Sequence, residues 1–131
     1  MDYAPRILIV DDEQSVREFF DQVLSGDGYH VAGVGTARHA MQVVDQRTFE
    51  VVLVDLSLPD GDGLDLVRQI RAELPYLKIL ATSGFLVGDM PAVAVQAGAN
   101  ATLAKPATAW ELRNAVYRLL EPSGRWQGAG K

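Results

Sequence analysis

The sequence predicts an α/β fold in which helices cover both faces of a parallel β-sheet. Short apolar runs rich in β-branched residues alternate with helical patterns five times along the chain. The clearest runs are continuously apolar, which is typical of parallel strands buried on both faces. A chain of 131 residues is long enough for one domain with a single core. We therefore expect one domain built from successive βα units.

Five apolar runs are the expected strands. They are Ile7–Val10, Val31–Val34, Val51–Val54, Ile79–Ala81 and Ala101–Ala104. The last run is weak because alanine has low β propensity. In a parallel sheet, the loops at the carboxyl ends of the strands carry the functional site. The residues that follow these runs are therefore the first candidates for function.

Helical patterns occupy the intervals between the strands. The first shows apolar residues at the spacing of a single helical stripe, Val16, Phe19, Phe20, Val23 and Leu24. The later patterns cover residues 37–44 after a cap at Thr36, 64–74 before Pro75, 90–97 and 112–120. Thr108 is expected to cap the last helix, with Glu111 completing a capping box. We expect the folded domain to span residues 1–121, with residues 122–131 as a flexible C-terminal tail or a severed linker, and Met1 favours an amino-terminal position for the domain.

The composition excludes several classes of protein. Cysteine is absent, which excludes disulfides, a thiolate nucleophile and cysteine-bound zinc. No apolar run approaches the roughly 20 residues that cross a bilayer, and no signal-peptide pattern opens the chain. The net charge of −5 argues against direct nucleic-acid binding by this domain. We expect a cytoplasmic protein without membrane contact.

Polar residues at the ends of four expected strands form the candidate site. Asp11 and Asp12 follow the first strand, and Asp55, Ser83 and Lys105 follow or lie just beyond the third, fourth and fifth. A carboxylate at the end of an apolar strand is costly unless a partner compensates its charge. Since parallel strands end at one edge of the sheet, these groups converge. Carboxylates gathered there would bind a hard cation such as Mg2+.

The chemistry of this set of residues is that of phosphoryl transfer. A carboxylate can act as a nucleophile towards an activated phosphoryl group. A lysine and a hydroxyl can bind the oxygens of the transferred group, and positioning with charge neutralisation supplies most of the catalysis in such reactions.

Together these residues resemble the receiver domain of two-component response regulators, over roughly residues 5–121. The resemblance is carried by Val10-Asp11-Asp12-Glu13, by Val54-Asp55 with Leu58-Pro59 and Asp62-Gly63, by Thr82-Ser83-Gly84, and by Lys105-Pro106. It implies a flavodoxin-like (βα)5 three-layer sandwich with a five-stranded parallel sheet of order 2-1-3-4-5.

The resemblance implies a role for each site residue. Asp55 would be the phosphoacceptor, and Asp11 and Asp12 would hold Mg2+, or Mn2+ as the alternative cation. The backbone carbonyl of Ser57 would complete the metal site. The donor would be a sensor histidine kinase or a histidine phosphotransfer protein.

The resemblance also implies how the bound group is recognised and used. Lys105 would contact the phosphoryl oxygens and Ser83 would close on them, and the Lys105–Pro106 peptide would be cis. Ser57 and Phe85 would tune the lifetime of the acyl phosphate. The reader of the signal would be a downstream protein target or a missing effector domain. Such a domain accepts and slowly hydrolyses one phosphoryl group and is not a turnover enzyme.

Two positions depart from the family pattern. Thr102 stands where the family usually has an aromatic residue that couples phosphorylation to the output face. Ala107 replaces a large apolar residue. The phosphorylation site is complete in sequence, whereas the usual aromatic read-out is missing.

Alternatives remain open from the sequence. Asp55 and Ser83 could each begin an ordinary turn. The chain could be an aspartyl-phosphate hydrolase, although Ser57 stands where such enzymes need a second aspartate, or an unphosphorylated receiver-like binding module. The run from Asp60 to Gly63 does not fit an EF-hand loop, and we interpret it as a tight loop whose glycines supply unusual backbone angles.

Overall fold

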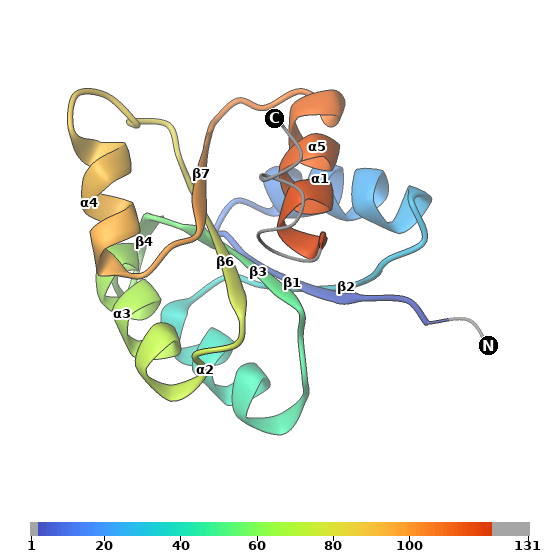
Figure 1. Cartoon of the computed structure of the whole chain (residues 1–131), viewed down its shortest axis with the longest axis horizontal. Coiled ribbons are helices and arrows are strands. Elements are labelled where there is room, and N and C mark those ends of the chain that lie inside the picture. The colour runs from blue at the N-terminus through green and yellow to red at the C-terminus, as the bar shows by residue number, and fades with distance from the viewer. Residues whose placement is uncertain (1–2, 122–131) are drawn as a thin grey trace.

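The computed structural model describes residues 3–121 of the chain and contains one central parallel sheet (Figure 1). The strand order is β2-β1-β3-β6-β7. The strands of this sheet are β1 (Arg6–Val10), β2 (His30–Val34), β3 (Val51–Asp55), β6 (Lys78–Ser83) and β7 (Ala101–Ala104). The short strands β4 (Ser57–Leu58) and β5 (Gly61–Asp62) form a separate hairpin. Counting only the strands of the main sheet, this is the expected order 2-1-3-4-5, so the predicted fold is confirmed. The tail expected at residues 122–131 lies outside the described residues.

Five helices cover the two faces of the sheet. They are α1 (Gln14–Gly26), α2 (Ala37–Gln46), α3 (Gly63–Glu73), α4 (Met90–Ala97) and α5 (Ala109–Leu120). Helices α1 and α5 lie on one face, and α2, α3 and α4 lie on the other (Figure 1). No helix in residues 3–121 is both long and apolar enough to cross a bilayer.

Alternate residues of the central strands contribute to two separate cores. In β1, Ile7 and Ile9 pack towards α1 and α5, whereas Leu8 and Val10 pack towards the opposite helices. Each of these side chains is at most 1% exposed. Burying an aliphatic side chain of this size contributes about 1.5–3 kcal/mol. The central strands are thereby fixed on both faces, and the positions of their carboxyl ends are fixed with them.

The helix starts follow the predicted capping chemistry. The Thr36 side chain accepts a hydrogen bond from the His39 N–H, 3.1 Å away. The Thr108 hydroxyl accepts from the Glu111 N–H at 3.1 Å, and the Glu111 carboxylate accepts from the Thr108 N–H at 2.9 Å. This reciprocal pair is the predicted capping box, and it fixes the start of α5 close to Lys105.

The segment after β3 differs from the predicted loop. It contains the β4–β5 hairpin, and neither Gly61 nor Gly63 has a positive φ, so the prediction of unusual backbone angles was wrong. Gly63 serves a different purpose. A Cβ at this position would lie 2.4 Å from the Cα of Leu56 and 2.5 Å from the carbonyl oxygen of Asp55. Glycine is required here because α3 begins in contact with the backbone at residue 55.

The same segment is anchored by two carboxylates at helix starts. The side chain of Asp60 accepts hydrogen bonds from the N–H groups of Ala37 and Arg38, at 2.9 and 3.1 Å. These bonds lower the pKa of Asp60, as expected for a carboxylate at a helix N-terminus. Asp62 accepts from the Leu64 N–H at 2.9 Å and caps α3. The loop that leaves Asp55 is therefore held to both α2 and α3.

Candidate functional site

Three acidic side chains converge at the carboxyl edge of the sheet. Asp11 and Asp12 follow β1, and Asp55 is the last residue of the neighbouring strand β3. One oxygen from each of the three carboxylates lies within 4.8 Å of the others. Asp11 is 1% exposed and Asp55 is 3% exposed, whereas Asp12 is exposed.

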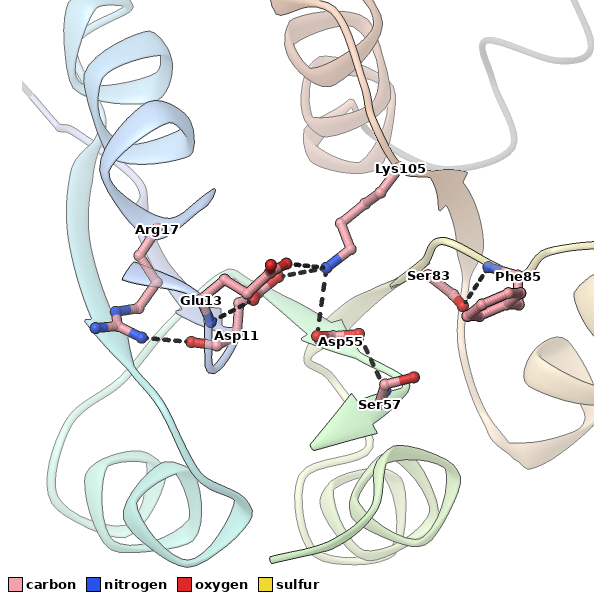
Figure 2. Close-up of polar contacts among 8 residues, drawn as sticks. All are labelled: Asp11, Glu13, Arg17, Asp55, Ser57, Ser83, Phe85 and Lys105. Atoms are coloured by element: carbon pink, nitrogen blue, oxygen red, sulfur yellow. Dashed lines mark hydrogen bonds and ion pairs between the residues drawn. The ribbon is translucent and has the colours of Figure 1, made fainter. Parts of the chain in front are cut away.

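Lys105 connects the two buried carboxylates. It follows β7, where its backbone N–H donates to the carbonyl of Ser83 at 2.8 Å. Its Nζ lies 2.9 Å from Oδ2 of Asp11 and 3.3 Å from Oδ2 of Asp55 (Figure 2). The ammonium also lies 3.7 Å from the carboxylate of Glu13. One positive charge thus faces a group of negative charges in a largely buried site.

The pKa values of Asp55 and Lys105 are both raised in the fold, for different reasons. Burial raises the pKa of Asp55, and the charge of Asp11 raises it further. The Ser57 N–H and Lys105 act in the opposite sense without cancelling these effects. Burial alone would lower the pKa of Lys105, yet hydrogen bonds and charges from Asp11 and Asp55 raise it above its ordinary value. The negative charge of the site is therefore only partly compensated by this lysine.

The two serines occupy different positions around Asp55. The backbone N–H of Ser57 donates to Oδ1 of Asp55 at 3.0 Å, so Asp55 does begin an Asx-type turn while its other oxygen faces Lys105. Ser83 ends β6 at the same edge of the sheet, and its hydroxyl accepts from the Phe85 N–H at 2.9 Å. Within residues 3–121, the Ser83 hydroxyl makes no hydrogen bond to Asp55 or Lys105. The structure therefore places Ser83 beside the site without bringing it into contact (Figure 2).

The acidic cluster fits a hard divalent cation. Mg2+ takes carboxylate oxygens and retains waters, so a site with buried and exposed carboxylates suits it. A second positive charge there would compensate the repulsion that raises the pKa of Asp55. The donor set therefore agrees with the cation inferred from the sequence.

A cavity of about 610 Å3 is lined by Asp55 and Lys105. An apolar part of its lining, here called the wall, comes from α1, the loop after β6 and the loop after β7. The wall residues are Val16, Phe19, Phe20, Phe85, Pro106 and Ala107. The Lys105–Pro106 peptide is cis, as the resemblance implies. Asp55 and Lys105 are thus reachable from solvent beside an apolar surface.

Thr102 and Ala107 take different places in this arrangement. Thr102 is half-buried within β7, paired in register with Ala81 of β6. Ala107 lines the cavity, where its small side chain leaves room beside Pro106.

Two charged residues near the cluster were given no role from the sequence, although Glu13 is part of the quoted motif. Glu13 lies within ion-pair distance of Lys105, and Arg17 donates from Nη1 to the backbone oxygen of Asp11 at 2.6 Å. The sequence contains one weak indication of the position of Arg17. Gly33 interrupts an apolar strand pattern and Gly35 directly follows it, which leaves space for a long side chain from a neighbouring helix.

Comparison with known proteins agrees with this geometry. The model of the response regulator receiver domain family matches residues 7–117. The chain is 33% identical over 120 residues to the alginate biosynthesis transcriptional regulatory protein AlgB of Pseudomonas putida, covering 92% of this chain and 27% of that protein. It is 33% identical over 107 residues to the KDP operon transcriptional regulatory protein KdpE of Escherichia coli, covering 82% of this chain and 47% of that protein.

Solved structures show the same architecture. The receiver domain of NtrX from Brucella abortus has a TM-score of 0.84 at 30% identity, covering 89% of this chain and 99% of that one. A CheY-like response regulator receiver domain protein from Methanospirillum hungatei has a TM-score of 0.84 at 28% identity, covering 88% of this chain and 93% of that one.

Proposed function

Because the chain belongs to the response regulator receiver domain family, we propose that it is a phosphoacceptor signalling module that takes its phosphoryl group onto Asp55. The donor is a phosphohistidine on a sensor histidine kinase or on a histidine phosphotransfer protein. We place the receiver domain at residues 1–121, which contains the family match to residues 7–117. The module acts in the cytoplasm.

One observation carries this proposal. The Nζ of Lys105 lies between Asp11 and Asp55, 2.9 and 3.3 Å from their carboxylate oxygens. These residues are distant in sequence and come from three different strand ends. A buried lysine that faces two carboxylates can bind the oxygens of an incoming phosphoryl group without leaving its position.

Each residue of the site has a separate role in the proposed phosphoryl transfer. A carboxylate oxygen of Asp55 forms a bond to phosphorus as the bond from phosphorus to the donor imidazole breaks, which gives an acyl phosphate and a free histidine. Lys105 binds the phosphoryl oxygens, and the Ser83 hydroxyl, at the same edge of the sheet, turns towards them. Asp11, Asp12, Asp55 and the Ser57 carbonyl would hold Mg2+, or Mn2+ in its place, and the bound cation would supply positive charge next to the transferred group.

The output of the module lies in another protein or protein segment. AlgB and KdpE are named as transcriptional regulatory proteins, and the chain spans only 27% and 47% of their lengths. We propose that a downstream protein target or an effector domain reads the phosphorylated state. The net charge of −5 argues against direct nucleic-acid contact by this domain.

Phosphoryl uptake from acetyl phosphate tests the proposal. Intact mass measurement should show one phosphoryl group per chain in the presence of Mg2+ and none after the metal is chelated. The unphosphorylated binding-module alternative predicts no incorporation under either condition.

Turnover distinguishes the receiver from the hydrolase alternative. A signalling module should release no more than a trace of product from a phosphomonoester such as p-nitrophenyl phosphate. Release of many equivalents per chain, lost when Asp55 is replaced, would establish the hydrolase instead.

A further inference from the structure

Arg17 is a charged residue that contacts the acidic cluster through the backbone. It lies on α1, and its Nη1 donates to the main-chain oxygen of Asp11 at 2.6 Å (Figure 2). No ion pair between Arg17 and an acidic side chain occurs within residues 3–121. Arg17 is half-buried and its guanidinium donates to a backbone carbonyl. A charged donor of this kind restrains the orientation of the peptide group that it binds.

The neighbouring edge strand leaves a space that this side chain fills. A Cβ at Gly33 would lie 3.3 Å from Cδ of Arg17, and a Cβ at Gly35 would lie 3.3 Å from its Nη1. Gly33 lies in β2 and Gly35 directly follows that strand, and a Cβ at either position would contact the Arg17 side chain. Glycine at both allows the guanidinium to reach the loop after β1.

The peptide that Arg17 fixes connects Asp11 to Asp12. Asp11 is also held by other hydrogen bonds. Its N–H donates to the carbonyl oxygen of Val34 at 3.0 Å. Its carboxylate accepts from the Glu13 N–H and from Nζ of Lys105, at 2.9 Å each. The Asp12 side chain is exposed and has no hydrogen bond to another described residue. Its position depends on the orientation of its own backbone, which begins with that peptide.

We propose that Arg17 is a positioning residue of the metal site, which holds the Asp11–Asp12 peptide so that the carboxylate of Asp12 faces the cation. The inference rests on the proposed metal dependence and adds a residue to it. Arg17 does not touch the cation. It acts by reducing the number of orientations that Asp12 must give up when the cation binds.

Metal affinity of the unphosphorylated chain tests this role. Binding of Mn2+ can be followed by the EPR signal of the free ion, with Mg2+ as competitor. Arg17→Met keeps most of the apolar stem and removes the donor, and it should weaken Mn2+ binding about 10-fold, the scale found for groups that orient metal ligands. Arg17→Lys retains one donor and should restore part of the affinity. Arg68→Met removes the same charge from an exposed residue of α3 and should bind as the unmodified chain does.

A double-mutant cycle separates positioning from a general effect on the fold. In an Asp12→Asn background, Arg17→Met should cost little further affinity, because the side chain that it positions has lost its charge. All titrations are made under conditions where circular dichroism and urea unfolding show a folded chain. An equal loss in both backgrounds, or no loss with Asp12 intact, would overturn the positioning role.

The same titrations separate this inference from the proposed function. Absence of Mn2+ and Mg2+ binding by the unmodified chain would overturn the metal site and, with it, the role of Arg17. Normal binding by the unmodified chain and by Arg17→Met alike would overturn only the role of Arg17.

Discussion

Replacing Asp55 by asparagine is expected to abolish phosphoryl uptake. The amide lacks the nucleophilic oxygen, although it keeps the shape that accepts the Ser57 N–H at 3.0 Å. Uptake from acetyl phosphate, measured by intact mass, should fall from one group per chain to none. Asp45→Asn, which removes a charge from an exposed position on α2, should leave uptake unchanged. Uptake that persisted in Asp55→Asn would remove Asp55 as the acceptor.

The same substitution should stabilise the chain when no metal is bound. The pKa of Asp55 is raised in the fold by burial and by the charge of Asp11. A carboxyl group with a raised pKa favours folding in its protonated form, and this contribution is lost as the pH rises through the folded pKa. Asparagine is neutral at every pH and should avoid that loss.

Urea unfolding as a function of pH checks this expectation. The unfolding midpoint of Asp55→Asn should exceed that of the unmodified chain at neutral pH without metal, and the difference should shrink in acid. Added Mg2+ should stabilise the unmodified chain more, because the proposed cation site includes the carboxylate that the variant lacks. A variant less stable than the unmodified chain at neutral pH without metal would contradict the pKa shift.

Replacing Lys105 by methionine should have the second large effect. The side chain is only 14% exposed and faces Asp11 and Asp55 at 2.9 and 3.3 Å. Its removal leaves two buried carboxylates without their positive partner, which typically costs about 3–5 kcal/mol. Phosphoryl uptake should slow about 100-fold, because Lys105 is the proposed donor to the phosphoryl oxygens.

The stability loss in Lys105→Met should already be present at neutral pH. The pKa of Lys105 is raised above its ordinary value of 10.5, so its contribution in the unmodified chain persists until the pH rises through that higher pKa. Added Mg2+ should recover part of the stability but not the uptake rate. Lys78→Met, at the opposite end of β6, is the matched control. Equal behaviour of the two variants in urea unfolding and uptake would show that Lys105 has no special role.

Much of the fold was predictable because the strands are apolar on both faces. The side chains of the run 51–54 and of the neighbouring run 7–10 are all apolar, so both faces of these strands must be buried. The strand order was implied by the resemblance to receiver domains. The ends of the strands were less visible. Strand β6 continues through Thr82 and Ser83, which pair with Leu103 and Ala104 of β7. Because these two side chains are polar, a search for apolar runs ends the strand before them.

Features that depend on contacts between distant segments were not predictable. Gly63 is required because the backbone at Asp55 and Leu56 lies against the start of α3, and a sequence does not show that approach. Arg71 donates to the carbonyls of Gly98 and Leu77 and to the side chain of Asn100, joining segments that no local pattern connects. The convergence of Asp11, Asp55 and Lys105 was expected because parallel strands end at one edge. The hydrogen bond from the Phe85 N–H to the Ser83 hydroxyl is local, and it is the turn that the sequence left open as an alternative.

Chemical identification of the phosphorylated residue tests the central claim most directly. Borohydride reduces an aspartyl phosphate to homoserine, which peptide mapping by mass spectrometry locates in the sequence. After treatment with acetyl phosphate and Mg2+, homoserine should appear at position 55 and at no other aspartate. Homoserine at position 11 or 12, or a phosphoryl group that resists borohydride, would contradict the assignment of Asp55 as the nucleophile of this site.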